Sequence, residues 1–385
     1  MEYVQERVTT LHDFADPVPD APTDRACVVV PMTERDHATL AAEQVLRTLE
    51  RVDPARVVVA LRADPAHAVE IRAWLDAYDF PCEVLWCNGP RVDDLFVEAG
   101  FDGPRGKGRD VWLALGVATA LEDLVVVHDA DARSYSERHV RRLLFPLDRG
   151  SDFAKGYYAR VENGRLYGRL FRLFYTPLVR ALADRHDAPL LDYLGAFRYA
   201  LAGEFAATSD LARSLRVQRG WGLEVGTLGD AYAHAGFAGS AQVDLGTHEH
   251  DHRAVSGPQG LGDMSEEVGA ALFHALADAG IELDFDTLPA AYRERAHALV
   301  EQYAADAAFN GLTYSPVDER EQVAAYAEAV RVPASDDRLP AWRSAPLDPR
   351  DVRDAARADL EEAANGGIDA DEEDATDGPT GGDGE

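Results

Sequence analysis

Short apolar runs alternate with segments of helical spacing along the first 160 residues. Continuous apolar runs rich in β-branched residues predict strands that are covered on both faces of a sheet. Helical segments between them predict the crossovers of a mostly parallel, right-handed α/β sheet. The predicted strands are 26–30, 57–61, 82–86, 124–127 and 151–159, and the predicted helices are 37–51, 65–78 and 108–121.

The pattern loosens after residue 151. A helix is predicted over 168–182, and residues 264–332 have helical periodicity with alanine-rich faces that indicate packing. The end of the chain, from about Glu361, is rich in Gly, Asp and Glu and is predicted to be disordered. We therefore expect an N-terminal extension over 1–24, an α/β domain over 25–262 with halves 25–150 and 151–262, a helical region over 263–345 and an acidic tail over 346–385.

Composition places the chain among soluble globular proteins. It has 385 residues, 46% of them hydrophobic, and no apolar run long enough to cross a bilayer, so we expect no stable membrane insertion. Cys27, Cys82 and Cys87 have no CxxC spacing, which argues against a disulfide framework and a structural zinc site. With no signal peptide recognisable at the amino end, we expect a cytoplasmic protein.

The formal net charge is −31, because 69 Asp and Glu outnumber 38 Lys and Arg. Such a field repels nucleic acids and anionic membranes, so we expect no nucleic-acid partner. An acidic excess with only two lysines is typical of adaptation to a salt-rich cytosol, where screening weakens self-repulsion. The two retained lysines, Lys107 and Lys155, are therefore worth inspecting.

The strand predicted over 124–127 ends in His128 and then in two aspartates one residue apart, Asp129 and Asp131. Ligands bind at the carboxyl ends of parallel strands. Two carboxylates there can hold Mg²⁺ or Mn²⁺ and leave positions open for phosphate oxygens. The alternative is that the pair caps a helix or makes a turn, and a DxD taken alone in an acidic protein favours that alternative.

Glycines surround Lys107 in GPRGKGRD, directly before a predicted helix. Backbone amides and a lysine can meet a phosphate there, although a flexible turn is equally compatible. The segment is not a Walker A loop, because Gly108 follows the lysine in place of Ser or Thr.

Further candidates have structural alternatives of the same kind. Glu34, after the first predicted strand, can accept hydrogen bonds from a nucleoside or can simply begin a helix. Glu224, in GWGLEVG, is either an acid at a helix start or an acid beside a sugar pocket. His248, His250 and His252 alternate and would share one face of a strand, which suggests zinc, but a surface tract is the commoner explanation.

The serial order of these motifs resembles that of the glucosyl-3-phosphoglycerate synthases, which are retaining GT-A glycosyltransferases. The matching segments, spread from about Val30 to His252, are VPMTERD, RGKGRDVWLAL, HDAD, KGYY, GRLFRLFYTPLV, LAGEFAAT, GWGLEVG and QVDLGTHEH. The resemblance implies a GT-A fold, that is, a Rossmann-like nucleotide-diphospho-sugar transferase, over 25–262, with a nucleotide-sugar half, an acceptor half and a helical C-terminal extension. It implies transfer of a hexose, usually from UDP-glucose, to a small anionic acceptor such as 3-phosphoglycerate, with retention and with Mg²⁺ or Mn²⁺.

The resemblance also implies roles on the donor side. Asp131 matches the metal-binding acid and is expected to act in catalysis, and His250 matches the histidine that completes the metal or diphosphate site. Asp129 is expected near the uridine and ribose. Lys107 matches the lysine that faces the donor phosphates, and Glu34 matches an acidic contact to the nucleotide.

On the acceptor side, Gly168 and Arg169 match the pair that grips the acceptor's phosphate, and Glu224 matches the acid beside the reacting sugar. Phe171 stands where the family has a threonine, and residues 59–64 lack the usual Asp-x-x-Ser turn of the nucleotide site. Acceptor and nucleotide identity therefore stay open.

Two other functions also remain open: a glycosyltransferase with a glycan or lipid acceptor, and a non-catalytic regulator that binds nucleotide sugars. We expect a homodimer that makes a compatible solute.

Overall fold

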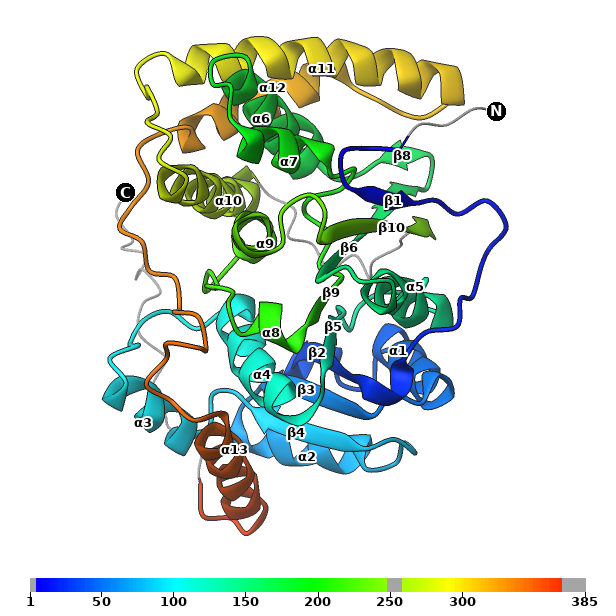
Figure 1. Cartoon of the computed structure of the whole chain (residues 1–385), viewed down its shortest axis with the longest axis vertical. Helices are drawn as coiled ribbons and strands as arrows, with labels where there is room; N and C mark the ends of the chain where they lie inside the picture. Colours follow the sequence, from blue (N-terminus) through cyan, green and yellow to red (C-terminus); the bar gives the residue numbers. More distant parts are fainter. Residues whose placement is uncertain (1–4, 248–257, 369–385) are drawn as a thin grey trace, which may run out of the picture.

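The computed structural model describes residues 5–247 and 258–368. Eight strands form one sheet in the order β1-β10-β6-β9-β5-β2-β3-β4, as Figure 1 shows. Two further short strands, β7 (Val161–Glu162) and β8 (Arg165–Leu166), pair separately. The strands of the main sheet are β1 (Thr9–Leu11), β2 (Ala26–Thr33), β3 (Arg56–Arg62), β4 (Cys82–Trp86), β5 (Leu124–Val127), β6 (Phe153–Ala159), β9 (Phe205–Thr208) and β10 (Ser240–Thr247).

All strands of the main sheet run in one direction except β9. The pairs β2–β3, β3–β4, β2–β5, β10–β6 and β1–β10 are parallel, whereas β9 is antiparallel to both of its neighbours, β5 and β6. The carboxyl ends of seven strands and the amino end of β9 therefore meet at one edge of the sheet. This edge is formed by the ends of the strands and not by an outer strand. Loops that follow β2, β3 and β5 are brought to the same edge as the residues that precede β9.

Helices cover both faces of the sheet. One core packs α1 (Leu40–Val52), α2 (Pro65–Leu75) and α5 (Glu137–Asp148) against one face. The other core contains α4 (Lys107–Leu121), α6 (Thr176–Ala183), α7 (Pro189–Ala196) and α9 (Leu223–His234), extended by α10 (Pro258–Asp278), α11 (Leu288–Asn310) and α12 (Pro316–Tyr326). Helices α3 (Pro90–Glu98) and α8 (Ser209–Ala212) complete the pattern between strands. The predicted α/β fold, with a mostly parallel sheet and a helical C-terminal region, is confirmed.

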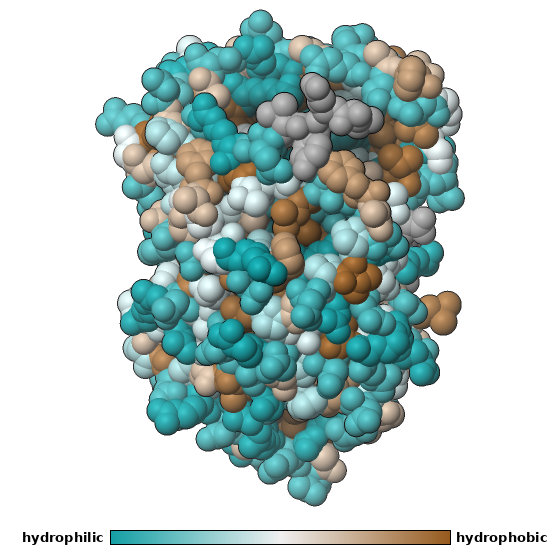
Figure 2. Space-filling model, turned by 45° about the vertical axis from the view of Figure 1, so that its right-hand side comes forward, coloured by the Kyte–Doolittle hydropathy of each residue, from teal (hydrophilic) through white to brown (hydrophobic). Residues whose placement is uncertain are grey.

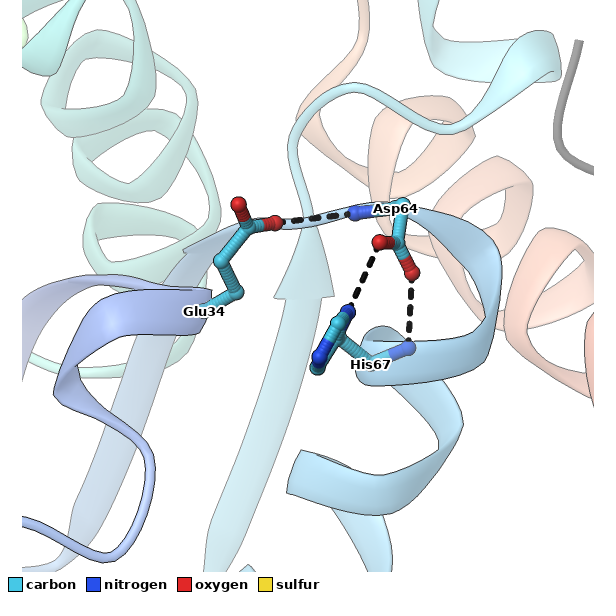
Figure 3. A group of neighbouring side chains, drawn as sticks. All are labelled: Glu34, Asp64 and His67. Atoms are coloured by element: carbon cyan, nitrogen blue, oxygen red, sulfur yellow. Dashed lines mark hydrogen bonds and ion pairs between the residues drawn. The ribbon is translucent and has the colours of Figure 1, made fainter. Parts of the chain in front are cut away.

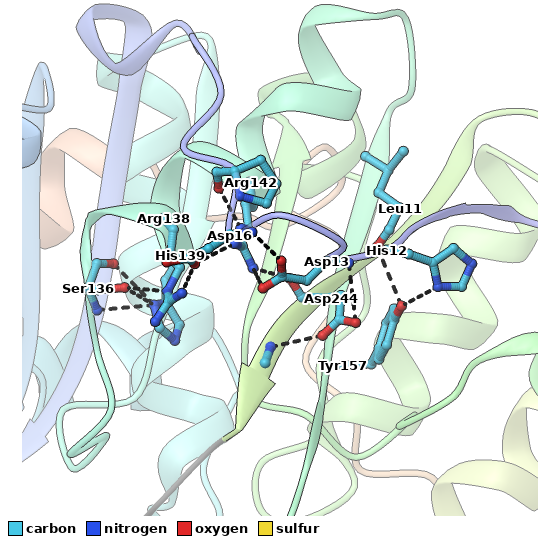
Figure 4. Close-up of polar contacts among 12 residues, drawn as sticks. Leu11, His12, Asp13, Asp16, Ser136, Arg138, His139, Arg142, Tyr157 and Asp244 are labelled. Carbon is cyan, nitrogen blue, oxygen red and sulfur yellow. Dashed lines mark hydrogen bonds and ion pairs between the residues drawn. The ribbon is translucent and has the colours of Figure 1, made fainter. Parts of the chain in front are cut away.

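The N-terminal segment is tied to the sheet. Thr9–Leu11 form β1, the outermost strand of the sheet on this side, which pairs with β10 in parallel register. Behind it, the buried guanidinium of Arg142 donates to Asp13, Asp16 and the backbone carbonyl of Asp244 at 3.0, 3.1 and 2.9 Å (Figure 4). Part of segment 1–24, which the sequence marks only as an extension, thus forms the outermost strand on one side of the sheet.

The helix predicted over 168–182 has two parts. Leu170–Tyr175 form a π-helical turn, and α6 continues from Thr176. Single π-turns are rare and occur frequently at functional sites, because the extra residue re-aims side chains. Here the turn directly follows Gly168, whose φ is +76°, and Arg169.

The sequence predicts an acidic tail over 346–385 that is disordered from about Glu361, whereas residues 349–364 of this segment form a helix. Helix α13 (Pro349–Ala364) packs against α2, α3, α4 and β4 (Figure 1). Its buried side chains are spaced by four residues within an otherwise charged sequence: Val352, Ala356 and Leu360. Asp359, also buried, accepts hydrogen bonds from the backbone and side chain of Arg91 at 3.0 and 2.8 Å.

Replacing Leu360 by alanine tests whether α13 is part of the folded core. Leu360 is 2% exposed, and loss of a buried leucine leaves a cavity that costs about 2–5 kcal/mol. We expect Leu360→Ala to lower the free energy of unfolding by that amount in a denaturant titration. The neighbouring exposed Glu361→Ala should stay within about 0.5 kcal/mol of the parent. Equal, small effects of both changes would contradict a structural role for this helix.

Candidate active site

The common edge of the sheet gathers most of the predicted site residues. Glu34 follows β2, Asp129 and Asp131 follow β5, and the residue before β9 is Glu204. The first turns of α4 and α9 carry Lys107 and Glu224.

Lys107 is the centre of an ion-pair cluster. Its Nζ lies 2.6 Å from Oδ1 of Asp129 and 3.5 Å from Oε1 of Glu224. Burial disfavours the ammonium, but the charges of Asp129 and Glu224 outweigh this penalty and raise the pKa of Lys107. The lysine therefore remains protonated and joins two acids that are far apart in the chain. Its side chain is 29% exposed, so it is within reach of a ligand.

The glycines around Lys107 serve close packing. A Cβ on Gly106 would lie 2.5 Å from the carbonyl oxygen of Arg219, and one on Gly108 would lie 1.8 Å from that of Gln218. The backbone N–H of Arg109 also donates to the carbonyl of Arg219 at 3.2 Å. The loop that carries Lys107 thus lies directly against the segment that leads into Glu224, which a bulkier sequence would prevent.

A second close approach holds Asp129. A Cβ on Gly203 would lie 2.5 Å from Oδ2 of Asp129. Glu204, the next residue, is 1% exposed. The segment LAGEF therefore places a buried carboxylate beside the loop of the DxD motif.

The metal-binding prediction rests on Asp131 and His250. Asp131 lies on the loop after β5, and His250 lies outside the described residues, as do His248 and His252. Within the DxD segment, His128 is fully buried, and burial lowers its pKa well below the usual value. It is therefore a neutral core residue that supports the loop.

After β2, Glu34 meets two residues to which the sequence assigns no role. Asp64 caps α2, accepting a hydrogen bond from the backbone N–H of His67 at 2.9 Å, and its other oxygen lies 2.7 Å from the His67 ring (Figure 3). The Glu34 carboxylate accepts from the backbone N–H of Asp64 at 3.4 Å. Ligand atoms of these three exposed residues lie within 4.8 Å of one another.

Arg169 lies at the other end of the site. Its Nε donates to Oε1 of Glu319 on α12 at 2.8 Å, and Arg172 donates to Oε2 of the same buried carboxylate at 3.4 Å. The side chain of Arg169 is 39% exposed. Glu319 therefore fixes the arginine without burying it.

Gly168 connects this arginine to the rest of the site. A Cβ on Gly168 would lie 3.5 Å from the Tyr199 side chain and 3.9 Å from Cδ of Arg160, so both residues pack beside this glycine. Arg160 donates to the Tyr199 hydroxyl at 3.3 Å. Tyr199 in turn lies within electrostatic range of Glu204 and Glu224.

The chain is similar in sequence to several proteins of one family. The chain is 32% identical to a glucosyl-3-phosphoglycerate synthase of Methanococcoides burtonii over 94% of this chain and 99% of that protein. It is 37% identical to one of Persephonella marina over 72% of each chain. The chain belongs to the glucosyl-3-phosphoglycerate synthase family. No protein-family model matches the chain.

Solved structures of the synthase from Mycobacterium tuberculosis have the same fold. The complex with Mn²⁺, UDP-glucose and phosphoglyceric acid superposes with a TM-score of 0.53 at 26% identity, covering 72% of this chain and 89% of that one. The complex with Mg²⁺ and UDP gives a TM-score of 0.53 at 26% identity, with 72% and 88% covered. The predicted membership of this glycosyltransferase family is confirmed.

Several polar residues near the predicted site residues have no role in the sequence-based prediction. They are Glu204, Tyr199, Asp64, His67 and Lys155. The sequence marks Lys155 only as one of two lysines. Local sequence gives no signal for such residues, because their position beside the site depends on segments that are distant along the chain.

Proposed function

We propose that this protein transfers a glucosyl group from UDP-glucose to 3-phosphoglycerate, with retention and with Mg²⁺ or Mn²⁺ bound. One observation carries the proposal: Lys107 joins Asp129 and Glu224 at the ligand-binding edge of the sheet, in a chain that aligns with 99% of a named relative. The donor class and the metals are those of the related solved complexes.

Each end of the breaking glycosidic bond has a matched group. Negative charge develops on the diphosphate and positive charge on the sugar as the bond breaks. Lys107 is protonated and partly exposed, so it can turn from Asp129 to the phosphates. The Glu224 carboxylate, which pairs with the same lysine, faces the sugar side.

The donor set fits a hard divalent cation. Asp131 supplies a carboxylate oxygen beside the cluster, and diphosphate oxygens with His250 would complete the ligands. When bound, the metal ion neutralises the diphosphate leaving group. We propose Glu34, Asp64 and His67 as contacts to the nucleoside.

The acceptor side offers cations for a phosphate and a carboxylate. Arg169 is held at Gly168 by Glu319, and Arg160 lies beside the same glycine. A guanidinium binds phosphate in bidentate fashion. Two arginines near one glycine favour a small anion over a neutral glycan acceptor.

The two alternatives remain distinguishable by experiment. A glycan or lipid acceptor would leave Arg169 without an anion to bind. A non-catalytic regulator would not need Lys107, Asp129 and Glu224 together, yet all three lie in contact. Among the described helices, none is long and apolar enough to cross a membrane.

Asp131→Asn tests the metal site and the activity together. Glucosyl transfer from UDP-glucose to 3-phosphoglycerate is measured by mass spectrometry. Removing one ligand charge should reduce this transfer to background, and chelation of the metal in the parent protein should do the same. Asp123→Asn, at an exposed position directly before β5, is the matched control and should transfer at the parental rate. Full activity of Asp131→Asn, or of the parent in chelator, would refute the metal role; an inactive parent would refute the transfer itself.

Arg169→Ala tests the acceptor site. Loss of a charge-assisted phosphate contact costs about 1.5–3 kcal/mol, so the KM for 3-phosphoglycerate should rise roughly one to two orders of magnitude, with little change for UDP-glucose. Glu319 keeps Arg172 as a partner, which limits structural damage. Exposed Arg180→Ala on α6 should leave both constants unchanged. Equal effects of Arg169→Ala on both substrates would remove this arginine from the acceptor site.

We also propose that the protein works as a homodimer in a salt-rich cytoplasm, where its product would serve as a compatible solute. The face shown in Figure 2 is mainly hydrophilic, and the net charge is −31. The Debye length falls from ~10 Å at 0.1 M to ~3 Å at 1 M salt, which weakens self-repulsion. The thermal midpoint and the transfer rate should therefore rise from low to molar KCl, and light scattering in the same buffers should give twice the 42.0 kDa of one chain. A thermal midpoint that does not change with salt would contradict the proposed adaptation to a salt-rich cytoplasm. The mass of a single chain in light scattering would contradict the proposed homodimer.

A further inference from the structure

Arg219 is a buried arginine that, within the described part of the chain, donates to backbone carbonyls and to no carboxylate. It is 8% exposed and shortly precedes Glu224 in the sequence. Its Nη2 donates to the carbonyls of Phe101 and Asp102 at 2.9 and 3.5 Å, and its Nε donates to that of Asp337 at 3.1 Å. A buried guanidinium is usually paired with an acid, because taking its charge out of water is costly. The contacts of Arg219 instead hold backbone segments together.

Two of these carbonyls belong to the loop that leads to Lys107. Loop 101–106 contains no helix or strand, and the φ of its Gly103 is +150°, which side chains rarely adopt. A Cβ on Gly103 would lie 3.1 Å from Cζ of Arg219, so the loop lies closely against the guanidinium. The guanidinium therefore fixes the backbone immediately before the lysine.

The backbone of Arg219 fixes the other side of Lys107. Helix α4 begins at this lysine, and its N-cap residue, Gly106, has no side chain that could accept from the first turn. The N–H groups of a first turn have no partner within their own helix. The N–H of Arg109 donates instead to the carbonyl of Arg219 at 3.2 Å. A carbonyl from a distant segment thus takes the place of the side-chain cap that is common at a helix start.

A third segment, 337–342, anchors this arrangement in the folded core. Its Leu339 exchanges two backbone hydrogen bonds with Val217, at 2.9 and 3.1 Å. Its Trp342 stacks on Trp112 of α4, with ring centres 4.1 Å apart. The guanidinium therefore ties the loop before the lysine to a segment that is itself fixed.

We propose that Arg219 is a positioning residue for donor binding: it fixes the backbone on both sides of Lys107 and so sets where this lysine meets the donor diphosphate. This inference rests on the proposed glucosyl transfer and adds a residue from outside the motifs that predict the site. A lysine has a long, flexible stem. Its ammonium reaches a phosphate at less entropic cost when the backbone that carries it is already held in place.

Arg219→Met removes the three hydrogen bonds at similar side-chain length. We expect the Kd for UDP with Mn²⁺, measured by titration calorimetry on the full chain, to rise about tenfold, because Lys107 then has to be ordered on binding. Arg105→Met is the matched control. It removes an exposed guanidinium from the same loop and should change the Kd less than about twofold, because solvent and salt screen an exposed charge. An unchanged Kd in Arg219→Met, or an equal rise in both variants, would overturn the proposal.

A double-mutant cycle separates positioning from a general loss of structure. If Arg219 acts through Lys107, Arg219→Met should raise the Kd for UDP in the parent and leave it nearly unchanged in Lys107→Met. The KM for 3-phosphoglycerate should change less than about threefold in Arg219→Met, because the proposed acceptor residue Arg169 lies on another element. Equal rises of the Kd in both backgrounds would overturn the proposal.

Gly106→Ala covers the case in which Arg219→Met does not fold. The φ of Gly106 is −168°, which any residue adopts, but the added Cβ would lie 2.5 Å from the carbonyl oxygen of Arg219 and push the two segments apart. The Kd for UDP should again rise, and a parental Kd would overturn the proposal. A parent protein that binds UDP but transfers no glucose would reject the proposed function alone, since the Kd comparison needs no transfer.

Discussion

The pairing of Lys107 with Asp129 and Glu224 is the interaction around which the site is organised. It joins the start of α4, the loop after β5 and the start of α9. Each segment reaches this point through backbone approaches that tolerate no Cβ, at Gly106, Gly108 and Gly203. In an isolated loop these glycines would only add flexibility. In this fold they bring opposite charges to contact distance at the edge where an α/β sheet binds its ligands.

The positive charge in that cluster also matters because the protein and its proposed substrates are all negatively charged. A chain with a formal charge of −31 repels anions at long range. Both proposed substrates are anionic, so positive charge has to be held locally. Lys107 is a positive charge beside Asp129 and Glu224, and Arg160 and Arg169 are positive charges near Gly168. High salt would screen the distant acids more than these short-range contacts, because screening acts mainly on exposed, separated charges.

Sequence patterns predicted what local composition decides. The strand over 82–86 agrees with β4 and the strand over 124–127 with β5, because continuous apolar runs need burial on both faces. Helix α13 was missed because its narrow apolar stripe is hidden among charges and becomes stable only against β4 and its neighbouring helices. Strand β1 has three residues and depends on β10 and on the Arg142 contacts.

The residues of the site also differ in whether local sequence could predict them. Lys107, Asp129 and Glu224 could be proposed from sequence because each follows a recognisable turn or strand end and their order matches a family. Glu204 could not, because its position beside the DxD loop depends on β9 running against β5 and β6, which brings an amino end to an edge made of carboxyl ends.

Phe171 belongs to an aromatic cluster beside the proposed acceptor arginines. The Phe171 ring lies 4.9 Å from that of Tyr199 and 5.7 Å from that of Tyr175, so it packs into an aromatic cluster. Tyr199 in turn accepts a hydrogen bond from Arg160, beside Gly168. Packing around Phe171 thus helps to hold the Arg160 guanidinium beside Gly168. A guanidinium binds phosphate more strongly than a hydroxyl does, so the proposed acceptor site could bind an anion without a threonine at position 171.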